Sequence, residues 1–224
     1  ALLFANRQAL GLATPIAIGI TVLLVTVAFS YRQTIMAYPQ GGGSYIVSRE
    51  NLGTIPSLVA AASLLIDYIL TVAVSMSAGV AAVTSAFPWL DPYRVTLAVI
   101  LIAVLTLANL RGLKESGNMF AVPTYAFIIS MFVLIAVGLY NMATGHIAPA
   151  PTPLIPHAEL GHSVTIFLIL RAFAAGCTAL TGIEAITDGV PAFKKPESRN
   201  ASITLVIMIV ILSLMFLGIT VLAE

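Results

Sequence analysis

Six apolar runs divide this chain of 224 residues, and each is long enough to cross a membrane as a helix. An α-helix rises about 1.5 Å per residue, so about 20 residues cross a hydrocarbon core of about 30 Å. Hydrophobic residues make up 59% of the chain and charged residues only 8%, whereas soluble domains carry about 25% charged residues. We therefore predict an all-α integral membrane protein whose residues 1–224 form a single transmembrane domain. The predicted spans are residues 11–31, 55–87, 94–110, 121–143, 164–190 and 202–223.

The length of one run and a proline in another lead to two further predictions about their helices. The run 55–87 is too long for a perpendicular span, so we expect it to tilt strongly or to project beyond the bilayer. The helix of the run 121–143 is expected to start near Pro123, because a proline in the first helical turn loses no hydrogen bond.

Basic residues are distributed unequally over the connections between the spans. One set of connections contains seven Lys or Arg residues and the opposite set contains two, while Arg171 lies within a span. Cytoplasmic connections of membrane proteins are enriched in Lys and Arg. We therefore predict a multi-pass protein of the cell membrane, in contact with lipid, whose connections 32–54, 111–120 and 191–201 are cytoplasmic.

The chain lacks the motifs of several other classes of protein. A net charge of +1 without a basic stripe argues against a nucleic-acid partner. The three glycines at 41–43 are not followed by a Lys-Ser or Lys-Thr pair, so they do not form a phosphate-binding loop, and no cofactor is expected. An intramembrane enzyme is a remote alternative, because neither a Gly-x-Gly-Asp nor a His-Glu-x-x-His sequence is present.

Two carboxylates lie at positions that are costly for a membrane protein. Asp67 lies in the second run and Glu184 in the fifth, and Thr181 precedes Glu184 by three residues. An ionisable side chain in a transmembrane segment costs at least a few kcal/mol, and it normally faces a cavity or a pathway. A carboxylate of this kind can also carry a proton, and the sequence leaves open which of the two does so.

The carboxylate of the second run begins a polar stripe. Asp67, Thr71 and Ser75 project on a helix within about 80° of one another and rise over about 12 Å. Two alternatives remain open for these residues. The two hydroxyls could bond a carbonyl one turn back, and Asp67 could form an ion pair with Arg171, which could otherwise act as a gate.

The fifth run contains a polar stretch bracketed by glycines. Gly176 and Gly182 enclose the sequence Cys-Thr-Ala-Leu-Thr in the middle of an apolar run. Glycine weakens a helix by up to about 1 kcal/mol relative to alanine, so we expect a break here, of the kind at which transporters bind ions. Mixed hydroxyl, carbonyl and carboxylate oxygens suit potassium better than calcium or magnesium. The alternative is a glycine-mediated helix contact without a break.

Three motifs carry a resemblance to a known family. The segments are 39–45 (PQGGGSY), 67–79 (DYILTVAVSMSAG), and 176–185 (GCTALTGIEA) with 190–196 (VPAFKKP). They resemble the segment after the second helix, the third helix and the sixth helix of the amino acid–polyamine–organocation superfamily. Within it, the chain looks most similar to the potassium uptake permeases of the Kup and KimA type.

The resemblance implies a fold and an activity. The six spans would be family helices two to seven of a LeuT-like inverted-repeat transporter of ten to twelve helices, incomplete at both ends, with part of the ion site supplied by a helix before Ala1. The implied activity is secondary active import of potassium, with proton symport, by alternating access around a midplane site. A homodimer of the full-length protein is one possible assembly. The resemblance places potassium at Asp67, Thr71, Thr181 and Glu184, with Ser75 on the ion path.

Two other functions stay open. A proton-coupled amino-acid permease of the same superfamily is the main alternative, although an anion on each of two helices disfavours the carboxylate of an amino acid. A purely structural subunit would leave both carboxylates unexplained.

Overall fold

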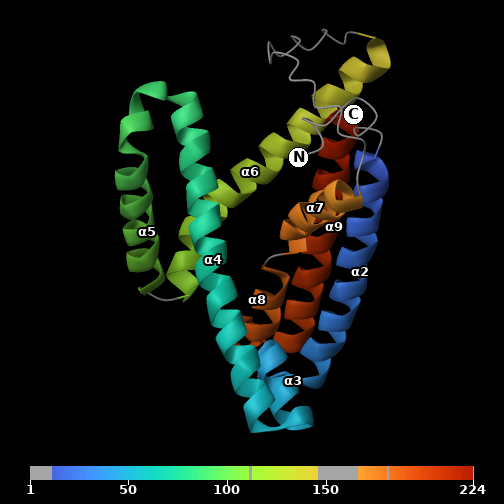
Figure 1. Ribbon diagram of the computed structural model, residues 1–224. Coiled ribbons are helices and arrows are strands. Elements are labelled where there is room, and N and C mark those ends of the chain that lie inside the picture. Colours follow the sequence, from blue (N-terminus) through green and yellow to red (C-terminus); the bar gives the residue numbers. More distant parts are fainter. Residues whose placement is uncertain (1–11, 111–112, 146–165, 181, 224) are drawn as a thin grey trace. The chain divides into compact units, whose positions relative to one another are not determined.

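The computed structural model describes residues 12–110, 113–145, 166–180 and 182–223, and every regular element within them is a helix (Figure 1). These residues belong to two compact units, one formed by residues 1–41 together with 127–224 and the other by residues 42–126. Each unit is considered separately below.

The first unit is built on two long helices that pack side by side, α2 and α9 (Figure 1). A chain of short helices, α7, η3, α8 and η4, connects to α9 and lies against the pair. The bounds are Ala13–Ala37 for α2, Ile166–Gly176 for α7, Cys177–Leu180 for η3, Ile183–Asp188 for α8, Val190–Ala192 for η4 and Glu197–Ala223 for α9.

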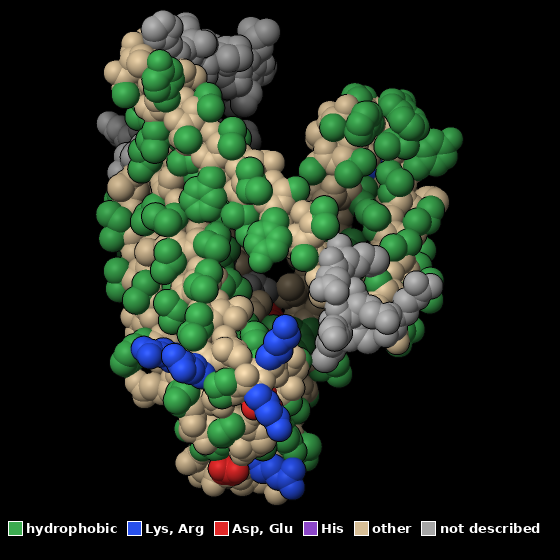
Figure 2. All heavy atoms as spheres, turned by 180° about the vertical axis from the view of Figure 1, so that it is seen from behind, with side chains coloured by type: hydrophobic (Ala, Val, Ile, Leu, Met, Phe, Trp, Pro, Cys, Tyr) green, Lys and Arg blue, Asp and Glu red, His purple; other side chains and the backbone are tan. Residues whose placement is uncertain are grey.

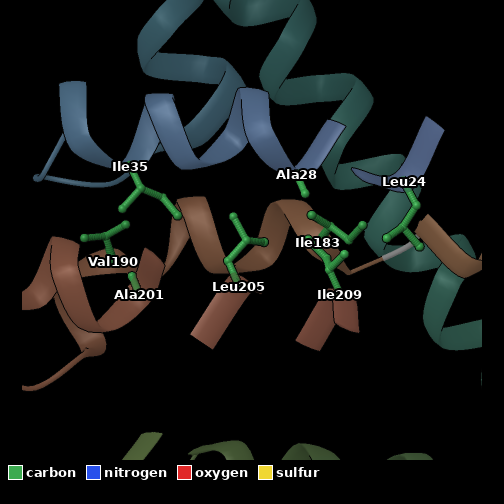
Figure 3. Close-up of a cluster of buried hydrophobic side chains, with 8 residues drawn as sticks. All are labelled: Leu24, Ala28, Ile35, Ile183, Val190, Ala201, Leu205 and Ile209. Carbon is green, nitrogen blue, oxygen red and sulfur yellow. The ribbon is translucent and has the colours of Figure 1, made fainter. Parts of the chain in front are cut away.

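The core of this unit is a stripe of apolar side chains between α2, α9 and the short helices (Figure 3). On α2 the buried residues recur every three to seven positions, which keeps them on one face of the helix. The small side chains of Ala28 and Ala201 allow close approach of the two helices, as is usual in membranes, where packing and not water exclusion holds helices together. The cluster consists of Leu24, Ala28, Ile35, Ile183, Val190, Ala201, Leu205 and Ile209.

The second unit contains three helices that follow one another closely along the chain, α3, α4 and α5. Both α3 and α5 pack against α4, and most large apolar side chains of the unit are exposed, as expected of surfaces that face lipid or other helices. The bounds are Gly43–Leu52 for α3, Thr54–Ala86 for α4, Pro88–Tyr93 for the 3-10 helix η2 and Arg94–Leu110 for α5. The helix α6, Leu113–Thr144, begins in this unit and ends in the first one.

Five of the six predicted spans are continuous segments long and apolar enough to cross a membrane. The bounds of α5 agree with the prediction of 94–110, and α4 is one continuous helix of 33 residues. The first helix continues to Ala37, six residues beyond the predicted end, so part of the predicted connection 32–54 is helical. The remaining segment, predicted as one span at 164–190, is discontinuous.

The fourth apolar span starts at Phe120, near Pro123 as predicted, but the expectation that its helix also starts there is wrong. The helix α6 begins at Leu113, and Pro123 lies inside it. A proline within a helix removes one backbone hydrogen bond, which membrane helices tolerate because other groups satisfy the freed carbonyl. The polar residues before Pro123 are typical of a loop, yet they form the first turns of this helix.

Three consecutive glycines turn the chain between α2 and α3. Gly41, Gly42 and Gly43 have φ angles of +77°, +93° and +42°, in the left-handed region that favours glycine. Gly41 also has a steric role, because a Cβ there would lie 2.7 Å from the carbonyl oxygen of Asp188 and 2.8 Å from Cδ of Pro191. Gly41 therefore lets the end of α2 approach the segment that follows α8.

We expect Gly41→Ala to destabilise the protein more than Gly53→Ala. Both glycines have positive φ angles, +77° and +95°, but a Cβ at Gly53 would have nothing within 4 Å. The difference isolates the steric overlap, for which about 1–3 kcal/mol is typical. Thermal unfolding of the full-length protein in detergent measures it, and equal losses in the two variants would contradict the close approach at Gly41.

Candidate functional site

The discontinuity in the predicted fifth span is the feature around which the candidate site is built. The helix α7 ends at Gly176, the 3-10 helix η3 covers Cys177–Leu180, and α8 starts at Ile183. The break predicted from Gly176 and Gly182 is therefore confirmed. A helix that ends leaves carbonyl oxygens without their usual amide partners, and such oxygens within a membrane are found where the backbone lines a cavity.

The two glycines at the break have different roles. A Cβ on Gly176 would overlap the Cδ1 atom of Ile20 on α2, so this glycine lets the end of α7 approach α2 closely. Gly182 has a φ angle of +90°, and a Cβ there would have nothing within 4 Å. Gly176 is therefore required for packing against α2. Gly182 is required for the turn, because an L-residue is strained at such a φ angle.

The carboxylate of Glu184 lies on α8, a short helix that two buried side chains anchor in its unit. Ile183 and Thr187, one turn apart, are 1% and 2% exposed and pack into the unit. The Thr187 hydroxyl donates a hydrogen bond of 2.6 Å to the carbonyl oxygen of Glu184. Glu184 itself is half-buried in the first turn of α8, immediately after the break. A half-buried carboxylate on a fixed short helix is suited to supply charge to a bound cation.

Thr181 and Arg171 are the two other residues of the fifth run for which the sequence predicts a role. Thr181 lies outside the described residues, so its shared face with Glu184 stays a prediction. Arg171 lies on α7 and is exposed, and within the described part of its own unit no carboxylate forms an ion pair with it.

The predicted polar stripe of the second run lies on α4. Because α4 is continuous from Thr54 to Ala86, Asp67, Thr71 and Ser75 occupy one face of a regular helix, rising about 12 Å. Asp67 and Ser75 are exposed and Thr71 is half-buried. Asp67 is thus presented at the surface of its unit and not enclosed by it.

The hydroxyls of this stripe differ from others on the same helix. Ser57, Ser77 and Ser85 each donate a hydrogen bond of 2.8 Å to a carbonyl oxygen of α4. Among the residues that the structure describes, Thr71 and Ser75 make no such bond. The alternative in which these two hydroxyls serve only to bond the preceding turn is therefore not observed, and both have oxygen lone pairs available to a ligand.

The two carboxylates belong to different units of the structure. Glu184 and Arg171 lie in the first unit, and Asp67 with its hydroxyl stripe lies in the second. The cavity between the carboxylates and the ion pair of Asp67 with Arg171 both stay predictions. Within the described ranges, no three His, Cys, Asp or Glu side chains lie close enough together to hold a metal ion.

Two contacts that the sequence did not predict also position this region. Thr187 bonds the backbone of Glu184, and Gly41 allows the end of α2 to reach the segment after α8. The signal for Thr187 is its place three residues after Glu184, from which a threonine can bond the preceding turn of a helix.

Comparison of the sequence with known proteins identifies the family of this chain. The family model described as amino acid permease matches residues 2–223. The potassium transporter KimA of Bacillus subtilis (strain 168) is 55% identical over 213 residues, which cover 93% of this chain and 34% of the relative. The chain thus spans about a third of the length of the curated relative that it matches. Since the family match extends over nearly the whole sequence, the chain belongs to the amino acid permease family of multi-pass membrane transporters, which implies a LeuT-like fold.

Proposed function

We propose that the full-length protein is a secondary transporter that imports potassium together with protons. The observation that carries this proposal is the helix break at residues 177–182, followed at once by the half-buried carboxylate of Glu184. The likeness to the potassium transporter KimA, at 55% identity, supports potassium as the cargo.

The chemistry of the proposed site suits a large monovalent cation. Backbone oxygens freed by the break and the hydroxyl of Thr181 would replace water around the ion, while Glu184 supplies negative charge. Potassium selectivity is associated with several oxygens of moderate field strength. A site built from carbonyl, hydroxyl and single carboxylate oxygens has this character, whereas a cage of several carboxylates would suit divalent cations.

Asp67, Thr71 and Ser75 are proposed to line the path by which the ion reaches or leaves that site. A negative charge at one end of the stripe attracts a cation, and the two hydroxyls can replace part of its hydration shell. Alternating access would then expose the site to each side of the membrane in turn by movement of helix groups around it. One of the two carboxylates would carry the coupled proton.

The second candidate function is proton-coupled transport of an amino acid, and the description of the matching family favours it. The carboxylate of an amino acid is met in such transporters by the N-termini of half-helices. Glu184, in the first turn of the helix after the break, would repel that group. An amino-acid substrate would therefore have to be cationic.

Rubidium uptake by the reconstituted full-length protein tests the proposal against this alternative. We expect radioactive rubidium to enter the vesicles in a manner driven by an imposed inward proton gradient and competed by potassium. Lysine, arginine and neutral amino acids in large excess should leave the uptake unchanged. Uptake of a labelled amino acid without rubidium uptake would contradict the potassium proposal. Rubidium uptake that does not change with the proton gradient would contradict the coupling of transport to protons.

A further inference from the structure

A pocket on the α2–α9 pair combines one cationic side chain with an apolar wall. Its volume is about 290 Å³, and it is lined by Arg32 of α2 and by Ser202, Ile203, Val206 and Ile207 of α9. All five residues belong to the first unit. The pocket is separate from Glu184, which lies on α8, and the proposed transport mechanism does not use it.

The cationic group of the pocket is held in place but not neutralised. The Nε atom of Arg32 donates a hydrogen bond of 3.2 Å to Oγ of Ser202, which is 6% exposed. This bond crosses from α2 to α9 and holds the Arg32 side chain at the pocket that both residues line. Among the described residues no carboxylate pairs with Arg32, so its terminal N–H groups are available to an anion.

The apolar wall continues from the cation along α9. Val206 and Ile207 lie three and four residues after Ile203, so the three side chains share one face of the helix. Their exposed fractions are 47%, 45% and 54%, which leaves an open apolar surface beside the charge. A ligand that fits has an anionic group at one end and a hydrocarbon chain at the other.

The pocket also lies near one end of each of the two helices that form it. Arg32 is five residues before the end of α2 and Ser202 is five residues after the start of α9, so the charge lies about 8 Å inside each helix end. Both ends adjoin the connections that the distribution of Lys and Arg predicts to be cytoplasmic. Figure 2 shows hydrophobic side chains over much of the face that it presents, with few charged ones.

We propose that this pocket binds an anionic glycerophospholipid of the cytoplasmic leaflet. Its phosphate would accept hydrogen bonds from the Arg32 guanidinium, a bidentate arrangement to which this group is well suited. One acyl chain would lie along Ile203, Val206 and Ile207. The cytoplasmic leaflet is the one rich in anionic lipid, and basic pockets between helices on that side bind such head groups. The volume is sufficient for a phosphate and the start of one chain.

Native mass spectrometry of the purified full-length protein tests this assignment. The probes are dioleoyl phosphatidylglycerol and dioleoyl phosphatidylcholine, added in turn at matched concentrations, and the readout is the affinity of the first lipid adduct. We expect the natural protein to prefer phosphatidylglycerol. Arg32→Ala should lose about fivefold in affinity for it, the effect of one basic residue near an anionic surface, and should lose less for phosphatidylcholine, because the choline cation offsets the charge of the phosphate.

Two further variants separate the pocket from general effects of charge and folding. Val206→Trp keeps the charge but fills the apolar wall, so it should lower phosphatidylglycerol binding as well, even if Arg32→Ala fails to fold. Arg49→Ala removes an exposed arginine outside the pocket, where it donates to the Tyr45 hydroxyl at 2.9 Å, and should bind as the natural protein does.

Three results would overturn the proposal. The first is an unchanged lipid preference in both Arg32→Ala and Val206→Trp. The second is a loss in Arg49→Ala as large as that in Arg32→Ala, which would point to diffuse surface charge. The third is full competition by soluble glycerol 3-phosphate, which would assign the pocket to a free phosphate and not to a lipid.

Discussion

Replacing Glu184 by Gln in the full-length protein is expected to reduce rubidium uptake by about 100-fold or more. The substitution keeps the shape of the side chain and its place on α8, where Ile183 and Thr187 remain packed. It removes the negative charge that faces the proposed ion, and loss of one partner of a desolvated charge pair costs about 2–5 kcal/mol. Uptake into proteoliposomes and growth at low potassium of a bacterial strain without its own potassium uptake systems both measure the effect.

A matched control for this substitution is Glu50→Gln. Glu50 is an exposed carboxylate on α3, so its neutralisation changes the net charge equally without touching the proposed site. We expect Glu50→Gln to transport normally and Glu184→Asp, which keeps the charge on a shorter side chain, to retain part of the activity. Normal transport by Glu184→Gln would exclude Glu184 from the ion site.

The second large effect is expected at the polar stripe of α4. Asp67→Asn should reduce rubidium uptake by about 10–100-fold at low rubidium and by less at saturating rubidium. The reason is that a charge lining a pathway acts mainly by raising the local concentration of the ion, which changes association rates by about 10–1,000-fold. Initial rates over a range of rubidium concentrations distinguish a raised KM from a lowered kcat.

Asp91→Asn provides the comparison for Asp67. Asp91 is exposed and forms an ion pair of 2.5 Å with Arg94 next to the start of α5, outside the stripe. We expect its loss to leave the concentration dependence unchanged. If Asp67→Asn lowered kcat as far as Glu184→Gln does and left KM unaltered, the assignment of Asp67 to a pathway would be wrong, and the residue would belong to the binding site or to proton transfer.

The apolar pattern predicts the membrane helices well but their ends less well. The bounds of α5 agree because the helix is mostly apolar along its whole length after Arg94. The end of α2 and the start of α6 differ from the prediction because both helices continue through polar residues, to Ala37 in the first case and from Leu113 in the second. Hydropathy predicts which residues lie in the hydrocarbon core. A helix can continue beyond those residues, because it ends only where its backbone hydrogen bonds end.

The helix break is predictable because it rests on local backbone chemistry. Gly182 has the positive φ angle that glycine alone adopts readily, and Gly176 lies where the α-helix gives way to a 3-10 helix. The close approach of Gly41 to Asp188 and Pro191 could not be predicted, since it joins residues about 150 positions apart. Contacts of this kind depend on how side chains fit across the whole unit.

In the candidate site, too, features of a single helix could be predicted from the sequence, whereas contacts between distant residues could not. The stripe on α4 and the position of Glu184 next to the break follow from spacing along single helices. A cavity that joins the two carboxylates stays a prediction, because they belong to different units and the periodicity of either segment does not derive it. Thr71 and Ser75 illustrate the limit, because their spacing predicts a common face but not the absence of a bond to the preceding turn.

Anomalous diffraction from crystals of the full-length protein grown in rubidium is the most direct test of the potassium site. The account predicts an anomalous peak in direct coordination with backbone oxygens of residues 177–182 or with the carboxylate of Glu184, and its disappearance when excess potassium replaces rubidium. A well-ordered rubidium peak elsewhere in the membrane domain, with none beside the helix break, would contradict the central claim.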